Sequence, residues 1–377
     1  MARDSGGGRG AGGMIYLDYQ ATTPLAPEAR QAMLPYLDEK FGNPHSPHRM
    51  GREAAAAVEL AREQVAALLP VQGRVAFTSG ATEALNWAIK GSQGPIVTVA
   101  TEHAAVLDSV RAVAQAGREV RILPVDADGL VDPDAARAAI MPGTGLVAVM
   151  LVNNEIGVIQ PVEELAALAH AVGALFLCDA VQGYGRVPIP ESCDLVALSG
   201  HKIHGPKGIG ALWVRDGITL DPLLHGGGQE APGRSGTLSP MLCAGLGAAA
   251  TLMAARRDED AAHVERLWRV ATRRLGADWR INGAIDRRWR GNLNLRRDGV
   301  DSARLISELR ELAFSAGSAC ASGSGRPSHV LKAIGLSDRQ ARSSLRLGFG
   351  RYTTEEEIDR AMGMILDAAD RRPMWAA

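Results

Sequence analysis

Lys202 has the surroundings that most favour covalent chemistry. It follows a short apolar run that ends at Ser199. Such a run is typical of a buried strand, and open α/β sheets bind ligands at the carboxyl ends of their strands. His201, His204 and Lys207 lie close in sequence. Burial and nearby positive charge both lower the pKa of a lysine, and a neutral lysine can form a Schiff base with a carbonyl. The alternative is a solvated loop lysine.

Asp179 is the predicted partner of Lys202, because it closes a second apolar run, 174–178. An ionised carboxylate at the end of a buried strand is costly unless a cation meets it. A pyridinium nitrogen is one such cation, and pyridoxal phosphate sites pair a Schiff-base lysine with an aspartate that faces the ring nitrogen. A helix N-cap and an ion pair with an arginine stay open as alternatives.

The segment 78–83 joins a predicted strand to a predicted helix and is rich in small and hydroxyl residues. Backbone N–H groups and the helix dipole make such a helix start a phosphate site. Ordinary capping by Thr78 or Ser79 is the alternative. Ser199, His201 and the turn 234–237 offer further phosphate donors.

Polar residues also follow other predicted strands. His103 comes after a strand that ends at Ala100, and it could stack on an aromatic ring, move protons or be a satisfied structural histidine. Asn153 and Asn154 follow the next strand along, where their amides could orient a cofactor oxygen or a substrate, or form a turn. Gln182 could donate to a ring hydroxyl. Five successive strand ends therefore carry groups suited to one ring with a phosphate.

Cys320 lies in the stretch 315–325, which consists largely of Gly, Ser and Ala. We expect this thiol to be exposed and reactive. Arg346 lies in a predicted strand, and its fork of N–H donors suits an α-carboxylate, with a surface salt bridge as the alternative. The remaining cysteines lie in apolar surroundings and are predicted to serve packing: Cys178, Cys193 and Cys243.

Strands and helices alternate from about residue 74 to residue 214, which predicts an α/β fold with a mostly parallel, seven-stranded sheet covered by helices on both faces. After Gly236 the pattern changes to a long helical stretch and then to mixed α and β. The expected organisation is a disordered lead-in over 1–13, a large domain over 14–256, and a smaller α+β C-terminal domain over 257–377 that carries Cys320.

The composition excludes several classes of protein. The 377 residues suit two domains, and the formal net charge of −1, from 41 Lys+Arg and 42 Asp+Glu, gives no electrostatic case for nucleic acid or an anionic membrane. No apolar run approaches the roughly 20 residues of a membrane helix, and no secretory signal appears. The four cysteines are widely spaced without a C-x-x-C pair, which argues against a disulfide framework or structural zinc. We expect a cytoplasmic protein.

Together these residues resemble the cysteine desulfurases, in the class V aminotransferase branch of the fold-type I pyridoxal phosphate enzymes. The resemblance runs from Met14 to about Asp370. The matching motifs, in chain order, are 16–24, 42–44, 78–83, 101–103, 152–157, 179–182, 199–210, 225–230, 234–238 and 317–320.

The resemblance implies a role for each matching residue. Lys202 would hold pyridoxal 5'-phosphate as a Schiff base, and Asp179 would face the ring nitrogen. Gln182 and Asn154 would lie near the ring hydroxyl and the substrate, while His103 would stack on the ring and shuttle protons. The phosphate would be held by Ala81, Thr82, Ser199 and His201.

For the substrate, the resemblance implies that Arg346 binds the carboxylate of L-cysteine. Cys320 would attack the substrate sulfur and become a persulfide, with L-alanine as product. Thr237 would reach the phosphate of the other subunit, so a homodimer with two shared sites is expected. No resident metal is expected, although Cys320 would share a transient iron–sulfur cluster during transfer.

The stretch around Cys320 resembles the long-loop type of the family, in which the loop carries sulfur to an acceptor such as an iron–sulfur scaffold protein. The C-terminus, 371–377, is shorter than in long-loop members that dock such a scaffold, which leaves the acceptor open. The alternatives are a selenocysteine lyase or another class V pyridoxal phosphate enzyme, and, outside enzymes, an inactive sulfur-transfer scaffold subunit.

Overall fold

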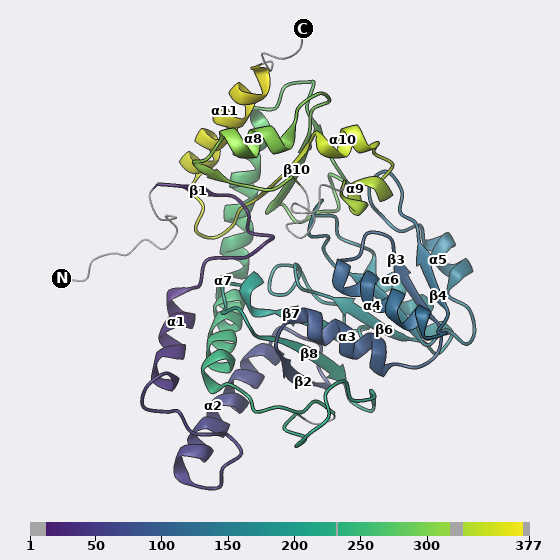
Figure 1. The fold of residues 1–377 in the computed structure, drawn as a ribbon, viewed down its shortest axis with the longest axis vertical. Coiled ribbons are helices and arrows are strands. Elements are labelled where there is room, and N and C mark those ends of the chain that lie inside the picture. The colour runs from purple at the N-terminus through teal and green to yellow at the C-terminus, as the bar shows by residue number, and fades with distance from the viewer. Residues whose placement is uncertain (1–12, 231–232, 317–326, 372–377) are drawn as a thin grey trace, which may run out of the picture.

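The computed structural model describes residues 13–230, 233–316 and 327–371 (Figure 1). In this part of the chain the central sheet has seven strands, in the order β2-β8-β7-β6-β5-β3-β4. Strand β8 runs antiparallel to both of its neighbours, and the other neighbouring strands are parallel. The bounds are β2 (Gly73–Thr78), β3 (Ile96–Val99), β4 (Val120–Leu123), β5 (Leu146–Met150), β6 (Leu175–Asp179), β7 (Leu195–Ser199) and β8 (Gly210–Arg215).

Helices cover both faces of this sheet, as the continuous apolar runs of its strands require. Alternate residues of a strand point to opposite faces, so Ile96 joins one buried cluster with α3 and α4 while Val97 joins another with α2, α6 and α7. The helices of this part are α1 (Pro27–Met33), the 3-10 turn η1 (Leu34–Tyr36), α2 (Arg49–Ala66), α3 (Ala81–Gly91), α4 (Ala104–Gln115), α5 (Pro133–Ala139), α6 (Val162–Ala171), the 3-10 turn η2 (Gly200–Lys202) and α7 (Pro240–Arg273).

A second core lies around a smaller antiparallel sheet of order β12-β10-β9, with β1 and β11 paired beside it. Helix α7 connects the two cores: Leu246 and Met253 pack in the first, and Leu267 and Trp268 in the second. The elements of this part are β1 (Ile15–Tyr16), β9 (Arg280–Ile281), β10 (Asn292–Arg296), α8 (Ser302–Glu308), β11 (Leu312–Ala313), α9 (His329–Ala333), α10 (Asp338–Arg342), β12 (Ser344–Gly348) and α11 (Glu355–Asp370).

The predicted α/β fold with a mostly parallel sheet is confirmed. Helix α2 begins at Arg49, where the His48 side chain accepts a hydrogen bond from the Gly51 N–H and caps the helix. The division near residue 256 stays a prediction, and it falls inside α7. The lead-in over residues 1–12 and the tail over 372–377 lie outside the described residues. Across the described ranges, no helix is both long and apolar enough to cross a membrane.

The segment that follows β8 is tied back to the main body by two ion pairs. Glu230 has a fully buried side chain that receives two hydrogen bonds from Arg62 of α2, at 2.8 and 3.0 Å. Arg62 also lies over the Phe77 ring, 5.0 Å from its centroid. Arg234 donates to Glu83 at the start of α3, at 2.8 Å. These contacts fix the polypeptide that leads to Thr237.

Removing the buried acid should therefore destabilise the fold. Glu230→Ala leaves the Arg62 charge largely desolvated and without its bidentate partner, so we expect the free energy of unfolding to fall by about 3 kcal/mol. Glu59→Ala removes the exposed partner of the same arginine, and should cost at most about 0.5 kcal/mol. Urea unfolding of both variants measures the difference. An equal fall in the free energy of unfolding for both variants would show that the buried Glu230–Arg62 pair stabilises the fold no more than the exposed Glu59–Arg62 pair.

Candidate active site

A cavity of about 610 Å³ opens at the carboxyl ends of the parallel strands. It gathers most of the residues that the sequence predicts for one site, although they are spread over more than 260 positions. Those that line it are Ala81, Thr82, His103, Asn154, Asp179, Gln182, Ser199, His201, Lys202 and Arg346. The shared edge of the sheet explains this convergence, because parallel strands end on the same side.

Two predicted site residues are not among the described residues that line this cavity. Thr237 is exposed and lies apart from the cavity within the described part of the chain. Cys320 lies outside the described residues. His204 lies two residues from Lys202 in sequence, but in the structure it is buried beside a second, small cavity, next to Tyr352 and Tyr19.

The start of α3 forms one end of the cavity. The N-cap residue is Gly80, and no described side chain caps the helix, so the alternative of capping by Thr78 or Ser79 is wrong. The Thr78 hydroxyl donates instead to the Gly80 carbonyl, at 2.9 Å. The first N–H groups of α3 are therefore available for an anion. His201 faces the same cavity, and burial, aided by Lys202, lowers its pKa to about 4, so its imidazole is neutral.

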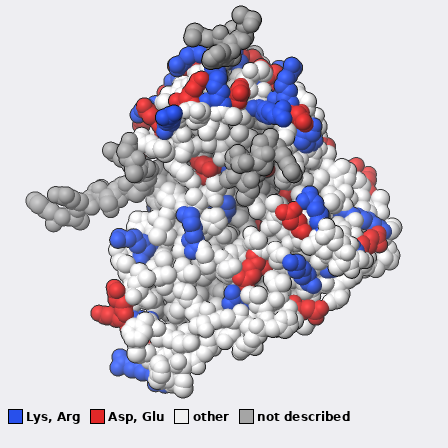
Figure 2. All heavy atoms as spheres, in the orientation of Figure 1, with Lys and Arg blue, Asp and Glu red and all other residues white. Residues whose placement is uncertain are grey.

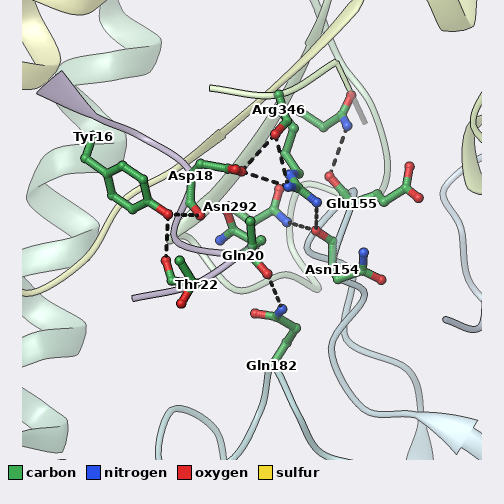
Figure 3. A network of polar contacts seen from close by, with 12 residues as sticks. Tyr16, Asp18, Gln20, Thr22, Asn154, Glu155, Gln182, Asn292 and Arg346 are labelled. Carbon is green, nitrogen blue, oxygen red and sulfur yellow. Dashed lines mark hydrogen bonds and ion pairs between the residues drawn. The ribbon is translucent and has the colours of Figure 1, made fainter. Parts of the chain in front are cut away.

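Lys202 lies in η2, the turn that directly follows β7. Its ammonium donates to the backbone carbonyl oxygens of Gln20 and Ala21, the latter at 2.8 Å. Gln182 donates from Nε2 to the same Gln20 oxygen at 3.0 Å, as Figure 3 shows. The segment around residue 20 therefore holds both side chains at the cavity wall.

Asp179 has a side chain that is almost completely buried, with 2% of the residue exposed. Its carboxylate accepts a hydrogen bond from the Val181 N–H at 3.0 Å. Burial raises its pKa to about 6, against the opposing effects of that hydrogen bond and of Lys202. The carboxylate is thus ionised at neutral pH but poorly solvated. A cation in the cavity would stabilise it.

Glu102 provides a second buried acid close to Asp179. One of its carboxyl oxygens, Oε1, accepts from the Met150 N–H at 2.7 Å, and Met150 pairs with Asp179 across β5 and β6. Burial, together with the Asp179 charge, holds the pKa of Glu102 well above its usual range. Burial therefore favours the neutral form of Glu102, and the Asp179 charge acts in the same direction.

Arg346 extends from β12 of the smaller sheet to the cavity and is almost fully buried. Figure 3 shows its guanidinium between Asp18 and the Asn154 backbone. It donates to the Asp18 carboxylate at 2.8 Å and to the Asn154 carbonyl at 3.1 Å. Its Nε has no hydrogen-bond partner in the described chain. The alternative of a surface salt bridge is wrong, since the pair with Asp18 is buried on the arginine side.

His103 caps α4 and also lines the cavity. Its Nδ1 accepts from the Ala105 N–H at 3.0 Å, and its pKa is lowered by burial and by Lys202. The neutral ring therefore carries its proton on Nε2. His103 is therefore a satisfied capping residue that also lines the cavity, and its stacking on a ring and its proton transfer stay predictions.

The residues that flank the segment 317–326 are held beside this site. Ser315 pairs with Arg346 through backbone hydrogen bonds, and its hydroxyl donates to Asp18 at 3.0 Å. On the other side, the Ser328 hydroxyl donates to the buried Glu155 carboxylate, and the His329 Nε2 lies 2.8 Å from the Glu102 carbonyl oxygen. The chain that carries Cys320 thus leaves and returns next to residues that line or support the cavity.

The comparisons with known proteins agree with this geometry. Residues 15–361 match the family model for class V aminotransferases. "Cysteine desulfurase IscS" of Rickettsia bellii (strain OSU 85-389) is 45% identical over 96% of this chain and 93% of its own length. The chain belongs to the cysteine desulfurases of the class V aminotransferase family.

Solved structures of similar proteins extend the likeness to three dimensions. A NifS-like protein from Rickettsia africae ESF-5 superimposes with a TM-score of 0.87 at 28% identity, covering 94% of this chain and 99% of its own. A structure described as SspA in complex with cysteine gives a TM-score of 0.78 at 33% identity, covering 90% and 99%. The cysteine desulfurase fold thus accounts for nearly the whole chain.

Sequence reasoning missed several residues that support this desulfurase site. Asp18 and Gln20 lie in a motif that resembles the family, yet no role follows from their types; the structure shows Asp18 on Arg346 and the Gln20 carbonyl between Lys202 and Gln182. The sequence also gives no signal for a role of Glu102 beyond its position next to His103. Every residue type has a backbone carbonyl, so hydrogen bonds to carbonyl oxygens cannot be predicted from the side chains in the sequence.

His204 makes the stability of this desulfurase depend on pH. Burial, together with Arg351 and Arg186, lowers its pKa to about 3. Between about pH 6.5 and pH 3 the unfolded chain holds a proton on this residue that the folded chain lacks, so stability falls as the pH falls. One such proton corresponds to about 1.4 kcal/mol per pH unit.

We therefore expect His204→Gln to lose less stability than the parent on acidification from pH 6 to pH 4, by about 2 kcal/mol. The substitution keeps a polar side chain of similar size but removes the imidazole, whose Nδ1 lies 3.0 Å from the Pro24 carbonyl oxygen. Urea unfolding at a series of pH values measures how the free energy of unfolding changes with pH in the parent and in the variant. The raised pKa values of Asp179 and Glu102 contribute to both slopes equally, so they cancel in the difference. Parallel curves for the two proteins would contradict the assignment.

Proposed function

We propose that this chain uses pyridoxal phosphate, bound at Lys202, to remove sulfur from L-cysteine. The products are L-alanine and a persulfide on Cys320. The observation that carries the proposal is the single cavity that gathers Lys202, Asp179, His103 and Arg346, with the chain of Cys320 anchored on both sides of it. The family is dependent on pyridoxal phosphate, and the site residues fit that group.

The fit rests on three features of the cavity. Its volume of about 610 Å³ admits a phosphorylated pyridine with an amino acid. The buried Asp179 carboxylate suits a protonated ring nitrogen, and the uncapped start of α3 at Ala81 and Thr82, with Ser199 and His201, suits the phosphate. When bound, pyridoxal phosphate supplies an electron sink for the substrate carbon.

Arg346 and Asn154 would orient the substrate. The guanidinium is held by Asp18 and by the Asn154 backbone, so its direction is fixed before the substrate carboxylate arrives. His103 would lie against the ring, and any proton that it exchanges is carried at Nε2, since its Nδ1 is engaged by the Ala105 N–H.

Covalent geometry allows Cys320 to reach this substrate. It lies four residues after Ala316, so its Cα stays within about 14 Å of the Ala316 Cα even in an extended chain. Its thiolate would attack the substrate sulfur as the carbon–sulfur bond breaks, and the carbon would take up a proton. The balance is L-cysteine plus a Cys320 thiol to L-alanine plus a Cys320 persulfide. The persulfide would then pass to an acceptor such as an iron–sulfur scaffold protein.

A homodimer with shared sites belongs to the same proposal. Thr237 is exposed, and its segment is held to the main body by Glu230 and Arg234, so it is available to a second copy. Large apolar side chains on and near α1 and α2 are also exposed, with Phe41 at 73% and Leu60 at 56%. Figure 2 shows few charged side chains over this lower part of the molecule, which supports apolar association.

The proposal predicts that Cys320→Ser separates substrate binding from sulfur transfer. The variant keeps Lys202 and Arg346, so it should bind L-cysteine and perturb the cofactor absorbance as the parent does. It should form no persulfide and no sustained alanine, because a hydroxyl is a far weaker nucleophile than a thiolate. Mass spectrometry and alanine release measure both steps, with Lys202→Ala as the control that should lose the borohydride-reducible cofactor link. Sustained alanine from Cys320→Ser, or a persulfide on Cys178, Cys193 or Cys243, would contradict the proposal.

The shared site predicts complementation between two defective chains. Lys202→Ala and Thr237→Ala should each be impaired alone. In a mixed dimer, one site combines both defects, while the other combines the intact Lys202 of one chain with the intact Thr237 of the other. Mixing the unfolded chains and refolding them should therefore restore alanine production above that of either variant. If the refolded mixture were no more active than the same amount of the Thr237→Ala variant alone, Thr237 would not act across the interface.

A further inference from the structure

Arg186 lies behind the wall of the cavity rather than in it. It lines the small second cavity together with His204, Trp289 and Arg351. From there its guanidinium donates forward to two segments that carry site residues. Its Nη1 bonds the Gln182 carbonyl at 3.0 Å and the Gln182 side-chain Oε1 at 3.2 Å, and its Nη2 bonds the Lys202 carbonyl.

The guanidinium is itself held in place. The Lys202 carbonyl fixes one side of the fork, and the Trp289 ring lies 5.9 Å from the Arg186 Cζ. Burial, with the nearby Arg351, lowers the pKa of Arg186 to about 10, so it remains charged at neutral pH. A charged, planar fork with several donors can bond three oxygens of two segments at once.

These contacts decide which end of the Gln182 amide faces which neighbour. Oε1 accepts from Arg186, and Nε2 donates to the Gln20 carbonyl at 3.0 Å. A flipped amide would place its NH2 group against the guanidinium and its oxygen against a carbonyl, and both contacts are repulsive. The second hydrogen of Nε2 is therefore held in a defined direction on a residue that lines the cavity.

We propose that Arg186 is a positioning residue that fixes the Gln182 amide with its N–H donor available to an oxygen of the bound cofactor ring. This inference rests on the proposed function, because the acceptor is the ring oxygen of pyridoxal phosphate. Arg186 acts through Gln182 and touches neither cofactor nor substrate.

The test is a double-mutant cycle on cofactor affinity, measured by titrating cofactor-free protein with pyridoxal phosphate. Arg186→Met removes the fork at similar side-chain length, and should weaken binding about tenfold, the loss expected for one hydrogen bond. Gln182→Leu should weaken binding by a similar factor. The double variant should be within about twofold of Gln182→Leu, because the donor that Arg186 orients is already gone.

Arg118→Met is the matched control. Arg118 also ties carbonyl oxygens of neighbouring segments, those of Ile89, Gln93 and Gly94, but at residues away from the cavity. Its loss should leave the affinity for pyridoxal phosphate unchanged. The absorbance maximum of the bound cofactor gives a second readout, which Arg186→Met and Gln182→Leu should shift in the same direction and Arg118→Met should not shift.

Two results would overturn the inference while the parent still binds pyridoxal phosphate. One is an unchanged affinity and absorbance maximum in Arg186→Met. The other is an equal loss from Arg186→Met in the parent and in the Gln182→Leu background, which would mean a general structural role. A parent protein that binds no pyridoxal phosphate would instead overturn the proposed function, and this inference with it.

Discussion

The buried carboxylate of Asp179 is the constraint on which the site depends. A charge this desolvated needs a cation or a set of donors, and within the described part of the chain a backbone N–H and the positive charge of Lys202 meet it. Glu102, bonded to the strand neighbour Met150, adds a second buried acid, and burial raises its pKa well above the usual range. The surrounding architecture follows from this constraint. The parallel sheet places the Asp179 carboxylate at the carboxyl edge of its strands, and that carboxylate faces the cavity.

Much of this arrangement could be predicted from the sequence, because an apolar run followed by a polar residue indicates where a buried strand ends. The apolar runs that end at Asp179 and just before Lys202 predict two buried strands and show where each strand ends. Because parallel strands have their carboxyl ends at the same edge of the sheet, the two residues are expected to lie close together. The sequence also predicts an anion site at the start of α3, and the N-cap residue Gly80 leaves the first N–H groups of this helix without a side-chain cap.

The remaining features could not be predicted, since they depend on which backbone atoms meet in space. The Gln20 carbonyl joins Lys202 to Gln182, yet a carbonyl is common to every residue type. His204 is two residues from Lys202 in sequence, but the turn sends it to a different cavity with Arg186. The position of Thr237, apart from the cavity, likewise follows from tertiary ion pairs rather than from local pattern.

Helix α7 spans the two hydrophobic cores whose parts of the chain carry Lys202 and Arg346. At 34 residues it is about 51 Å long, and its two ends pack in different cores. Lys202 belongs to the part with the central sheet and Arg346 to the part with the smaller sheet, so α7 helps to set the spacing between these two side chains. A bend of a few degrees at its middle, where Asp260 pairs with Arg351, would move the far end by about 2 Å, a displacement on the scale of a hydrogen bond. The spacing of Lys202 and Arg346 thus depends on the stiffness of α7 together with direct contacts such as the hydrogen bond from Arg346 to the Asn154 carbonyl.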